Sequence, residues 1–308
     1  MTTANNNCPL CGGSDREPHS RFDDIGREHS IALCRSCGMV FTVLDNAVDH
    51  NKIYSEDEYE VLDNRGSIFD KIIAFEARNN LRRLQQMGTP GGALLDFGAG
   101  KGQFLSIAKS MGWEVFGIET SKPRATFARE SYGLDVTDEY YDSGVIKGGP
   151  FQIVSLFHVL EHLTPSIFAE LIKSNLEKDG VLFLEVPNLG SWQARIAGRR
   201  WLHLDIPRHL LHFDIHSLRS MLGQSDLEIR RLSTFSLHLG IPGMASALMS
   251  RLGYRGHIID DLRRKRIHFW TAILLAILPI AFVLEWMAAL AGRGGVLTTF
   301  VKFRELDT

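Results

Sequence analysis

The stretch LLDFGAGKGQFL, residues 94–105, predicts the fold of this chain. An apolar run ends in the acidic Asp96, a glycine-rich turn follows, and a helical pattern begins, which is the order strand, tight loop and helix. Gly98, Gly100 and Gly102 carry no Cβ, so the backbone can turn sharply and a ligand can approach it closely. The stretch therefore predicts a ligand-binding loop at the end of a buried strand.

Two nucleotide-type ligands use such a loop, and the glycine spacing distinguishes them. A dinucleotide fingerprint requires G-x-G-x-x-G, whereas Gln103 occupies the place of the third glycine here. S-adenosylmethionine has no phosphate and carries a sulfonium and an ammonium, so a carboxylate at Asp96 suits it electrostatically. The next apolar run, residues 115–118, ends in Glu119, where an acid can accept hydrogen bonds from both ribose hydroxyls. The pattern favours S-adenosylmethionine, with an NAD-dependent oxidoreductase or epimerase as the alternative.

Strand and helix patterns alternate around this loop. Helices are expected at residues 68–87, 104–111, 124–132, 167–176 and 216–222, and strands at 114–119, 134–136, 151–157, 181–186 and 227–235. Such alternation predicts a parallel, doubly wound, Rossmann-like α/β sheet. Ligands of such sheets bind at the carboxyl ends of the strands, where the glycine-rich loop lies.

All four cysteines lie within the first 37 residues, as the pairs Cys8/Cys11 and Cys34/Cys37. Each Cys-x-x-Cys pair places two thiolates on one tight turn, and four thiolates complete a tetrahedral Zn²⁺ site with no open position. The sequence therefore predicts a structural zinc ribbon over residues 1–45.

Bulk properties exclude some functions. The net charge of −2 argues against general affinity for nucleic acid, so no nucleic-acid partner is expected. Residues 1–7 are polar and show no secretory pattern, and paired cysteines suit metal binding in a reducing compartment, so we expect a cytoplasmic location. A non-enzymatic module that recruits a protein or nucleic acid through the ribbon is a third alternative, which the ligand-binding motifs disfavour.

With these motifs, residues 69–304 resemble the class I S-adenosylmethionine-dependent methyltransferases. The resemblance rests on DFGAGKG (96–102), GIE (117–119), FHVLEH (157–162) and GVLFLEVPN (180–188). A zinc-ribbon start followed by such a domain is similar to a bacterial branch that modifies sugars, secondary metabolites or envelope components.

The resemblance implies a seven-stranded sheet and a set of cofactor contacts. The glycine-rich loop would hold the methionine part and Glu119 the ribose, while Phe157 and His158 would flank the adenine and the sulfonium. Asp138 is the expected acid at the adenine edge, with Asp135 as its rival. The expected cofactor-binding residues are Asp96, Gly98, Gly100, Gly102, Glu119, Asp138, Phe157 and His158.

Methyl transfer to a hydroxyl requires a group that removes the proton, and histidine titrates near neutral pH. His158 and His162 are spaced i, i+4 after the fourth strand and could share one helical face. The stretch WLHLDIPRHLLHF (201–213) adds His209 within an insertion, residues 188–213, that we expect to cover the substrate. The catalytic candidates are therefore His158, His162 and His209, of which His162 and His209 are preferred as the base.

Two further residues of this insertion are expected to bind substrate, Arg208 through an anionic group and His212. A metal site made of the histidines and acids in these segments remains an alternative, because their spacing is not diagnostic.

The C-terminal region contains a hydrophobic insertion, residues 236–294. Residues 267–290 are long and apolar enough to cross a bilayer, and the basic run RRKR (263–266) precedes them. Residues 296–303 are expected to rejoin the sheet as its last strand, which excludes a single crossing. We therefore expect this segment to lie on the cytoplasmic face of a membrane, with Glu285 reaching the interface. A buried or oligomer-interface helix is the alternative.

The sequence thus divides into a zinc ribbon (1–45), a linker with a leading helix (46–90) and a methyltransferase domain (91–308) with its two insertions. The expected reaction is methyl transfer from S-adenosylmethionine to a hydroxyl of a glycan, a lipid-linked saccharide or a related metabolite.

Overall fold

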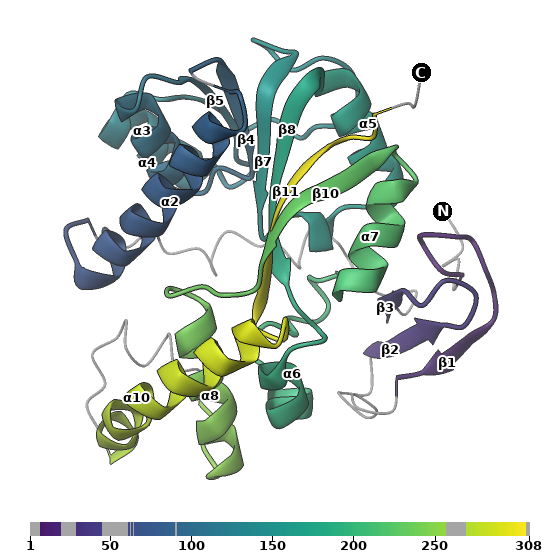
Figure 1. Cartoon of the computed structure of the whole chain (residues 1–308), viewed down its shortest axis with the longest axis vertical. Helices are drawn as coiled ribbons and strands as arrows, with labels where there is room; N and C mark the ends of the chain where they lie inside the picture. The colour runs from purple at the N-terminus through teal and green to yellow at the C-terminus, as the bar shows by residue number, and fades with distance from the viewer. Residues whose placement is uncertain are drawn as a thin grey trace. The chain divides into compact units, whose positions relative to one another are not determined.

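The structure of the chain is a computed structural model that describes residues 7–19, 29–44, 61, 63, 65–89, 91–256 and 269–305 (Figure 1). The chain forms two compact units. The ribbon unit contains Met1–Ala47, Val186–Leu218 and Ser233–Thr298, and the sheet unit contains Val48–Glu185, Arg219–Leu232 and Thr299–Thr308. The basic run 263–266, noted in the sequence, lies outside the described residues.

The sheet unit is built on a seven-stranded sheet in the order β10-β11-β8-β7-β4-β5-β6. The strands are β4 (Ala93–Phe97), β5 (Glu114–Ile118), β6 (Asp135–Thr137), β7 (Phe151–Phe157), β8 (Leu176–Pro187), β10 (Leu227–Ser233) and β11 (Val296–Phe303). β4 pairs in parallel with β5 and β7, β6 continues the parallel set beside β5, and β8 continues it beside β7. The predicted Rossmann-like sheet is confirmed, and β11 rejoins it between β8 and β10 as expected.

Several helices of this unit begin or end at capping residues. They are α2 (Ile68–Gln86), α3 (Gln103–Ser110), α4 (Lys122–Tyr132), α5 (Pro165–Asn175) and α7 (Ile215–Gly223), the last of which begins in the ribbon unit. The hydroxyl of Ser67 accepts from the N–H of Asp70 at the start of α2, and Thr164 caps α5 ahead of Pro165. Gly133 ends α4 in the left-handed conformation that favours glycine.

The core of the sheet unit lies between the parallel strands and these helices. Leu94, Ile153, Val181 and Phe183 are fully buried in it. The ring of Phe183 stacks on that of Phe300 at a centroid distance of 4.6 Å, which packs β8 against the inserted β11.

The ribbon unit contains a second, four-stranded sheet in the order β1-β2-β3-β9. Its strands are β1 (Arg16–Pro18), β2 (His29–Cys34), β3 (Val40–Leu44) and β9 (Leu211–His212), and all neighbours pair antiparallel. Val40 lies opposite His212 in this register. The cysteine-bearing segment and the insertion 188–213, which the sequence treats as parts of different domains, therefore share one sheet.

The rest of the ribbon unit is helical, with α6 (Trp192–Ala197), η3 (Gly198–Arg200), α8 (Gly240–Arg251) and α10 (Phe269–Leu290). Met244 and Met249 of α8 pack with Leu274, Ile277 and Ala281 of α10. By length and composition, α10 is the one helix in the described part of the chain that is apolar enough to cross a membrane, and 22% of its most apolar window is buried.

Glu285 of α10 is fully buried, so the expectation that its carboxylate reaches a membrane interface is wrong. Its Oε2 accepts a 2.8 Å hydrogen bond from Gln193 Nε2, and its Oε1 accepts one of 2.7 Å from the N–H of Gly295. A buried carboxylate costs free energy unless it is hydrogen-bonded, and these two donors inside the ribbon unit explain why Glu285 faces inward.

Candidate functional site

The glycine-rich loop after β4 begins the candidate site, and its three glycines serve two different purposes. Gly98, Gly100 and Gly102 all adopt positive φ. A Cβ at Gly98 would overlap Val159, and one at Gly102 would overlap Leu134 and Ala128, so these positions need glycine for packing. A Cβ at Gly100 would meet no heavy atom within 4 Å. Gly100 therefore marks the open side of the loop, where a ligand can approach the backbone.

Glu119 follows β5 and is held in place by two backbone donors. Its Oε2 accepts a 2.7 Å hydrogen bond from the N–H of Gly100, and its Oε1 accepts one of 2.8 Å from the N–H of Ser121. The side chain is nearly buried. Each carboxylate oxygen retains a second acceptor site, so Glu119 can also accept hydrogen bonds from a ligand's paired hydroxyls.

Asp96, on β4, is buried at the same end of the sheet. Burial raises the pKa of this carboxyl to about 7, although the hydroxyl of Ser155 donates a 2.7 Å hydrogen bond to its Oδ1 and lowers the pKa. The neighbouring charge of Glu119 raises the pKa further. A cationic ligand group nearby would favour the ionised form, so Asp96 is suited to a positively charged ligand.

His158 follows β7 and lies between two buried carboxylates. Its Nδ1 is 3.4 Å from Oε1 of Glu161 and its Nε2 is 3.4 Å from Oε1 of Glu185. Its backbone N–H donates to the carbonyl of Glu185, and its φ of +55° is in the left-handed region. Burial alone lowers the pKa of this imidazole, but hydrogen bonds to Glu161 and Glu185 raise it to about 10.

These contacts disfavour His158 as a catalytic base, because an imidazole that already holds a proton cannot take another. The helical face expected to combine His158 with His162 is also absent from the structure. Only a short 3-10 turn, η2 (Leu160–His162), follows the strand, and α5 begins later at Pro165. His162 ends this turn, half-buried.

The residues expected to contact the adenine lie at two strands of the sheet unit, the edge strand β6 and the central strand β7. Asp138 follows the carboxyl end of β6 and lies 3.6 Å from Arg129, whereas Asp135 begins β6 and pairs with Lys147 at 2.8 Å. Because ligands bind at the carboxyl ends of the strands, Asp138 is favoured over Asp135 as the acid at the adenine edge. Phe157 ends β7, and its ring makes edge contacts with Phe104 and Phe183. Its ring is thus held by the aromatic core next to His158.

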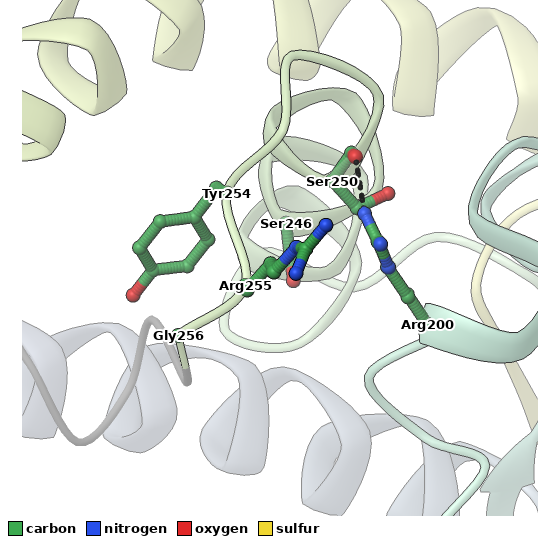
Figure 2. A pocket seen from close by; sticks show the side chains of 6 residues that line it. All are labelled: Arg200, Ser246, Ser250, Tyr254, Arg255 and Gly256. Atoms are coloured by element: carbon green, nitrogen blue, oxygen red, sulfur yellow. Dashed lines mark hydrogen bonds between the residues drawn. The ribbon is translucent and has the colours of Figure 1, made fainter.

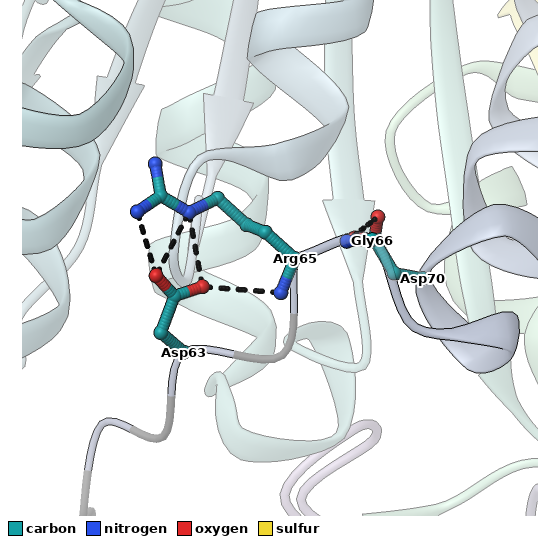
Figure 3. Close-up of polar contacts among 4 residues, drawn as sticks. All are labelled: Asp63, Arg65, Gly66 and Asp70. Atoms are coloured by element: carbon teal, nitrogen blue, oxygen red, sulfur yellow. Dashed lines mark hydrogen bonds and ion pairs between the residues drawn. The ribbon is translucent and has the colours of Figure 1, made fainter.

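Sequence reasoning missed the contacts that fix the start of α2 beside the loop. Gln103 Nε2 donates a 2.6 Å hydrogen bond to Oδ1 of Asp70, so Gln103, in place of a third glycine, connects α3 to α2. Figure 3 shows the other oxygen of Asp70 accepting from the N–H of Gly66, and the ion pair of Arg65 with Asp63 beside it. Arg65 also lies 5.4 Å over the ring of Phe127 on α4. No sequence motif indicates these contacts.

Three predicted site residues belong to the ribbon unit. His209 is buried, and its Nδ1 lies 3.0 Å from the carbonyl oxygen of His203, which leaves Nε2 as the basic nitrogen. Arg208 pairs with Asp205 at 3.0 Å.

The third of these residues, His212 of β9, is buried, and its Nε2 lies 2.9 Å from Oγ1 of Thr42 on β3. Burial lowers its pKa to about 3 and keeps it neutral. His212 therefore joins two strands, a structural position that does not suit the expected contact with substrate.

The four cysteines converge in the ribbon unit. The Sγ atoms of Cys8 and Cys37 are 3.5 Å apart, those of Cys11 and Cys34 are 3.6 Å apart, and all four lie within 4.8 Å of one another. Each pair lies on a turn closed by the N–H of a glycine, Gly12 to the Cys8 carbonyl and Gly38 to the Cys34 carbonyl. These distances fit four thiolates around one tetrahedral ion.

The order of the seven strands, with β11 inserted next to β8, is that of a Rossmann-like methyltransferase sheet. The model of a methyltransferase-domain family matches residues 69–232, just over half of the chain. The chain belongs to this family, and it is an S-adenosylmethionine-dependent methyltransferase.

Several solved structures are similar to this chain. A SAM-dependent methyltransferase from Archaeoglobus fulgidus is 17% identical, with a TM-score of 0.47 over 76% of this chain and 94% of that chain. YjhP from E. coli is 15% identical, with a TM-score of 0.47 over 82% and 100%. An O-methyltransferase from a trans-AT PKS multienzyme of Brevibacillus brevis, in complex with S-adenosyl-L-homocysteine, is 15% identical, with a TM-score of 0.44 over 78% and 81%. No curated protein matches the chain at a significant level.

Proposed function

We propose that this methyltransferase acts on a hydroxyl of a glycan, a lipid-linked saccharide or a related metabolite that it meets at the cytoplasmic surface of a membrane. S-adenosylmethionine supplies an electrophilic methyl group on its sulfonium. The chain's own residues bind the cofactor, align the acceptor and remove its proton. The exposed apolar face of α10 is the observation that supports an acceptor at a membrane surface.

The residues of the sheet unit fit the cofactor. Asp96 would balance a positive group of the cofactor, and Glu119, already oriented by Gly100 and Ser121, would accept from the ribose hydroxyls. The loop backbone is open at Gly100 for the methionine part. Asp138 and Phe157 are the proposed adenine contacts.

His162 is the preferred general base. The turn that carries it packs on the cofactor loop, because Val159 fills the space where a Cβ of Gly98 would lie. An imidazole can act as a general base for a hydroxyl, and His162 is preferred over His158, which already holds a proton between Glu161 and Glu185. In the ribbon unit, His209 is the second candidate through its Nε2, and Arg208 is the proposed contact for an anionic substrate group.

The apolar face of α10 supports contact with a membrane. Exposed side chains on this helix include Leu275 (65%), Val283 (49%), Trp286 (51%) and Leu290 (71%). Glu285, the one charged residue of the helix, is turned into the ribbon unit, so the outward face carries no charge. A tryptophan on such a face suits the boundary between headgroups and acyl chains.

The ribbon is proposed to hold one structural Zn²⁺ through Cys8, Cys11, Cys34 and Cys37. The donor set consists of four thiolates that already converge, and it leaves no open position for a substrate. Because Cys34 begins the turn between β2 and β3, the ion would stabilise the sheet to which β9 also pairs.

The reaction can be tested with methyl-labelled S-adenosylmethionine. The purified chain would be incubated with two fractions of bacterial extract, a lipid fraction that contains lipid-linked saccharides and a fraction of water-soluble metabolites. We expect label in the lipid fraction, on a product heavier by one CH₂ group. The label should survive mild alkali, because a methyl ether survives it and a methyl ester does not.

His162→Asn is the matched variant, since it should bind S-adenosylmethionine normally and transfer the methyl group at least about a hundredfold more slowly. Label confined to water-soluble products would contradict the proposal of a lipid-linked acceptor. Label that mild alkali releases would contradict the proposal that the methylated group is a hydroxyl. An unchanged rate for His162→Asn would exclude His162 as the base.

A further inference from the structure

A polar cavity of about 460 Å³ lies within the ribbon unit, and none of the described residues that line it is assigned to cofactor binding. It is lined by Arg200 at the end of η3, Ser246 and Ser250 of α8, and the chain that follows α8, Tyr254 to Gly256. Figure 2 shows the two guanidinium groups, from Arg200 and Arg255, extending toward the same part of α8. None of the described residues that line the cavity is acidic.

The donors in this cavity exceed the hydrogen bonds that the described residues make there. One guanidinium nitrogen of Arg200 donates a 3.1 Å hydrogen bond to the carbonyl oxygen of Ser250. A guanidinium has five N–H donors, so Arg200 and Arg255 together retain several donors and two positive charges. The hydroxyl of Ser246 adds a further donor at the wall of the cavity. Two arginines with adjacent hydroxyls are the chemistry that binds a phosphoryl group.

The cavity adjoins the apolar helix within the same unit. The ring of Tyr254 lies 5.3 Å from the ring of Trp270 near the start of α10, and Tyr254 also belongs to the core between α8 and α10. Phe269, beside Trp270, is 74% exposed. A positive cavity next to an exposed apolar surface fits a ligand that joins a phosphoryl group to an apolar chain.

We propose that this cavity binds the phosphate or diphosphate of a lipid-linked molecule while α10 contacts the membrane that holds it. The inference rests on the proposed membrane-surface function and deepens it, because it assigns the acceptor's lipid phosphate to Arg200 and Arg255. Inorganic phosphate shares the recognising chemistry and lacks only the apolar chain.

The test uses the full-length chain with three probes: phosphatidylcholine vesicles, the same vesicles with a polyprenyl phosphate added, and inorganic phosphate in solution. The variant is Arg200→Gln with Arg255→Gln. The control is Arg219→Gln with Arg231→Gln, two exposed arginines of the sheet unit whose loss removes the same net charge. Affinity for S-adenosylmethionine, measured in parallel, verifies that each variant is folded.

Wild-type and control chains should bind the polyprenyl phosphate vesicles, and the Arg200/Arg255 variant should bind them roughly tenfold or more weakly while keeping its cofactor affinity. An equal loss of vesicle binding in the control would overturn the proposal, because binding would then depend on the net charge of the protein and not on this cavity. If inorganic phosphate displaces the protein from these vesicles at the same concentration as the polyprenyl phosphate, the proposal that the ligand is lipid-linked would be overturned.

The two proposals fail separately. If wild type methylates a lipid fraction but the variant binds vesicles unchanged, the cavity assignment is wrong and the proposed function stands. If the methyl acceptor is water-soluble while vesicle binding still depends on Arg200 and Arg255, the acceptor assignment fails and the phosphoryl cavity stands.

Discussion

The backbone N–H of Gly100 donates a 2.7 Å hydrogen bond to Oε2 of Glu119, which joins the loop after β4 to the acid after β5. The carboxylate is thereby oriented before a ligand binds, so less freedom is lost on binding. Because the same residue orders the loop and faces the proposed ribose site, a change at Glu119 should weaken cofactor binding through both effects.

Glu119→Ala should weaken S-adenosylmethionine binding by about 1.5–3 kcal/mol for each charge-assisted hydrogen bond lost. Titration calorimetry measures the change. Glu114→Ala, at the exposed opposite end of β5, is the control and should bind normally. An unchanged affinity in Glu119→Ala would refute the assignment of this acid to the ribose.

His158 should remain protonated well above neutral pH. Its pKa is raised from 6.5 to about 10, so its contribution to stability is complete below pH 6.5 and is lost as the pH rises through 10. NMR of the ring carbons should show an imidazolium at pH 8. A titration centred near pH 6.5 would contradict the position between Glu161 and Glu185.

His158→Ala should lower the free energy of unfolding by about 3 kcal/mol at pH 7, because it leaves two buried carboxylates without their cation. Denaturant unfolding measures this loss. His216→Ala, an exposed histidine at the start of α7, is the control and should change the stability little.

Glu285 should make the protein less stable as the pH rises from 4.5 to 7. Burial raises its pKa to about 7, so the folded chain holds a proton that the unfolded chain has released. The free energy of unfolding should fall by on the order of 3 kcal/mol between pH 4.5 and 7. Glu285→Gln should remove the part of the pH dependence due to Glu285 and leave the part due to the buried Asp96, whereas Glu177→Gln, exposed on β8, should keep both parts. Parallel profiles for the wild-type and Glu285→Gln chains would place the carboxylate in water.

Protein purified without chelator should contain one zinc ion per chain. Cys11→Ser should lose that zinc and lower the melting temperature, because closed thiolate sites contribute directly to folding. Ser36→Ala, on the second cysteine turn, should retain the metal. Wild-type protein with far less than one zinc per chain would refute the ribbon as a metal site.

The exposed face of α10 should determine membrane binding. Trp286→Ser with Leu290→Ser should reduce binding to vesicles by roughly tenfold or more, since each buried side chain of this size contributes about 1.5–3 kcal/mol. Flotation with anionic vesicles measures this binding. Tyr140→Ser with Val145→Ser removes two exposed side chains of the sheet unit and should leave flotation unchanged. A wild-type chain that ignores vesicles would identify α10 as an interface helix.

Much of the fold was predictable because its signals are local. The turn at Gly98 to Gly102 depends on the absence of a Cβ, and the alternation of apolar runs with helical stripes follows from backbone periodicity. The same holds for the two cysteine turns, since a Cys-x-x-Cys pair brings its thiolates together within one turn. Segment 296–303 could be placed in the sheet only through the family resemblance.

The remainder was decided by groups far apart in the sequence. Glu185, together with the nearby Glu161, raises the pKa of His158. Gln193 donates to the buried carboxylate of Glu285, and Asp70 accepts a hydrogen bond from Gln103. The pairing of β3 with β9 unites the ribbon with a later insertion. The sequence alone determined the strand–loop–helix unit, the positions of its acids and the cysteine turns, because chain neighbours and backbone geometry specify them. Only the tertiary structure decided which histidine keeps its proton and which face of α10 is apolar, because burial and charge depend on what packs nearby.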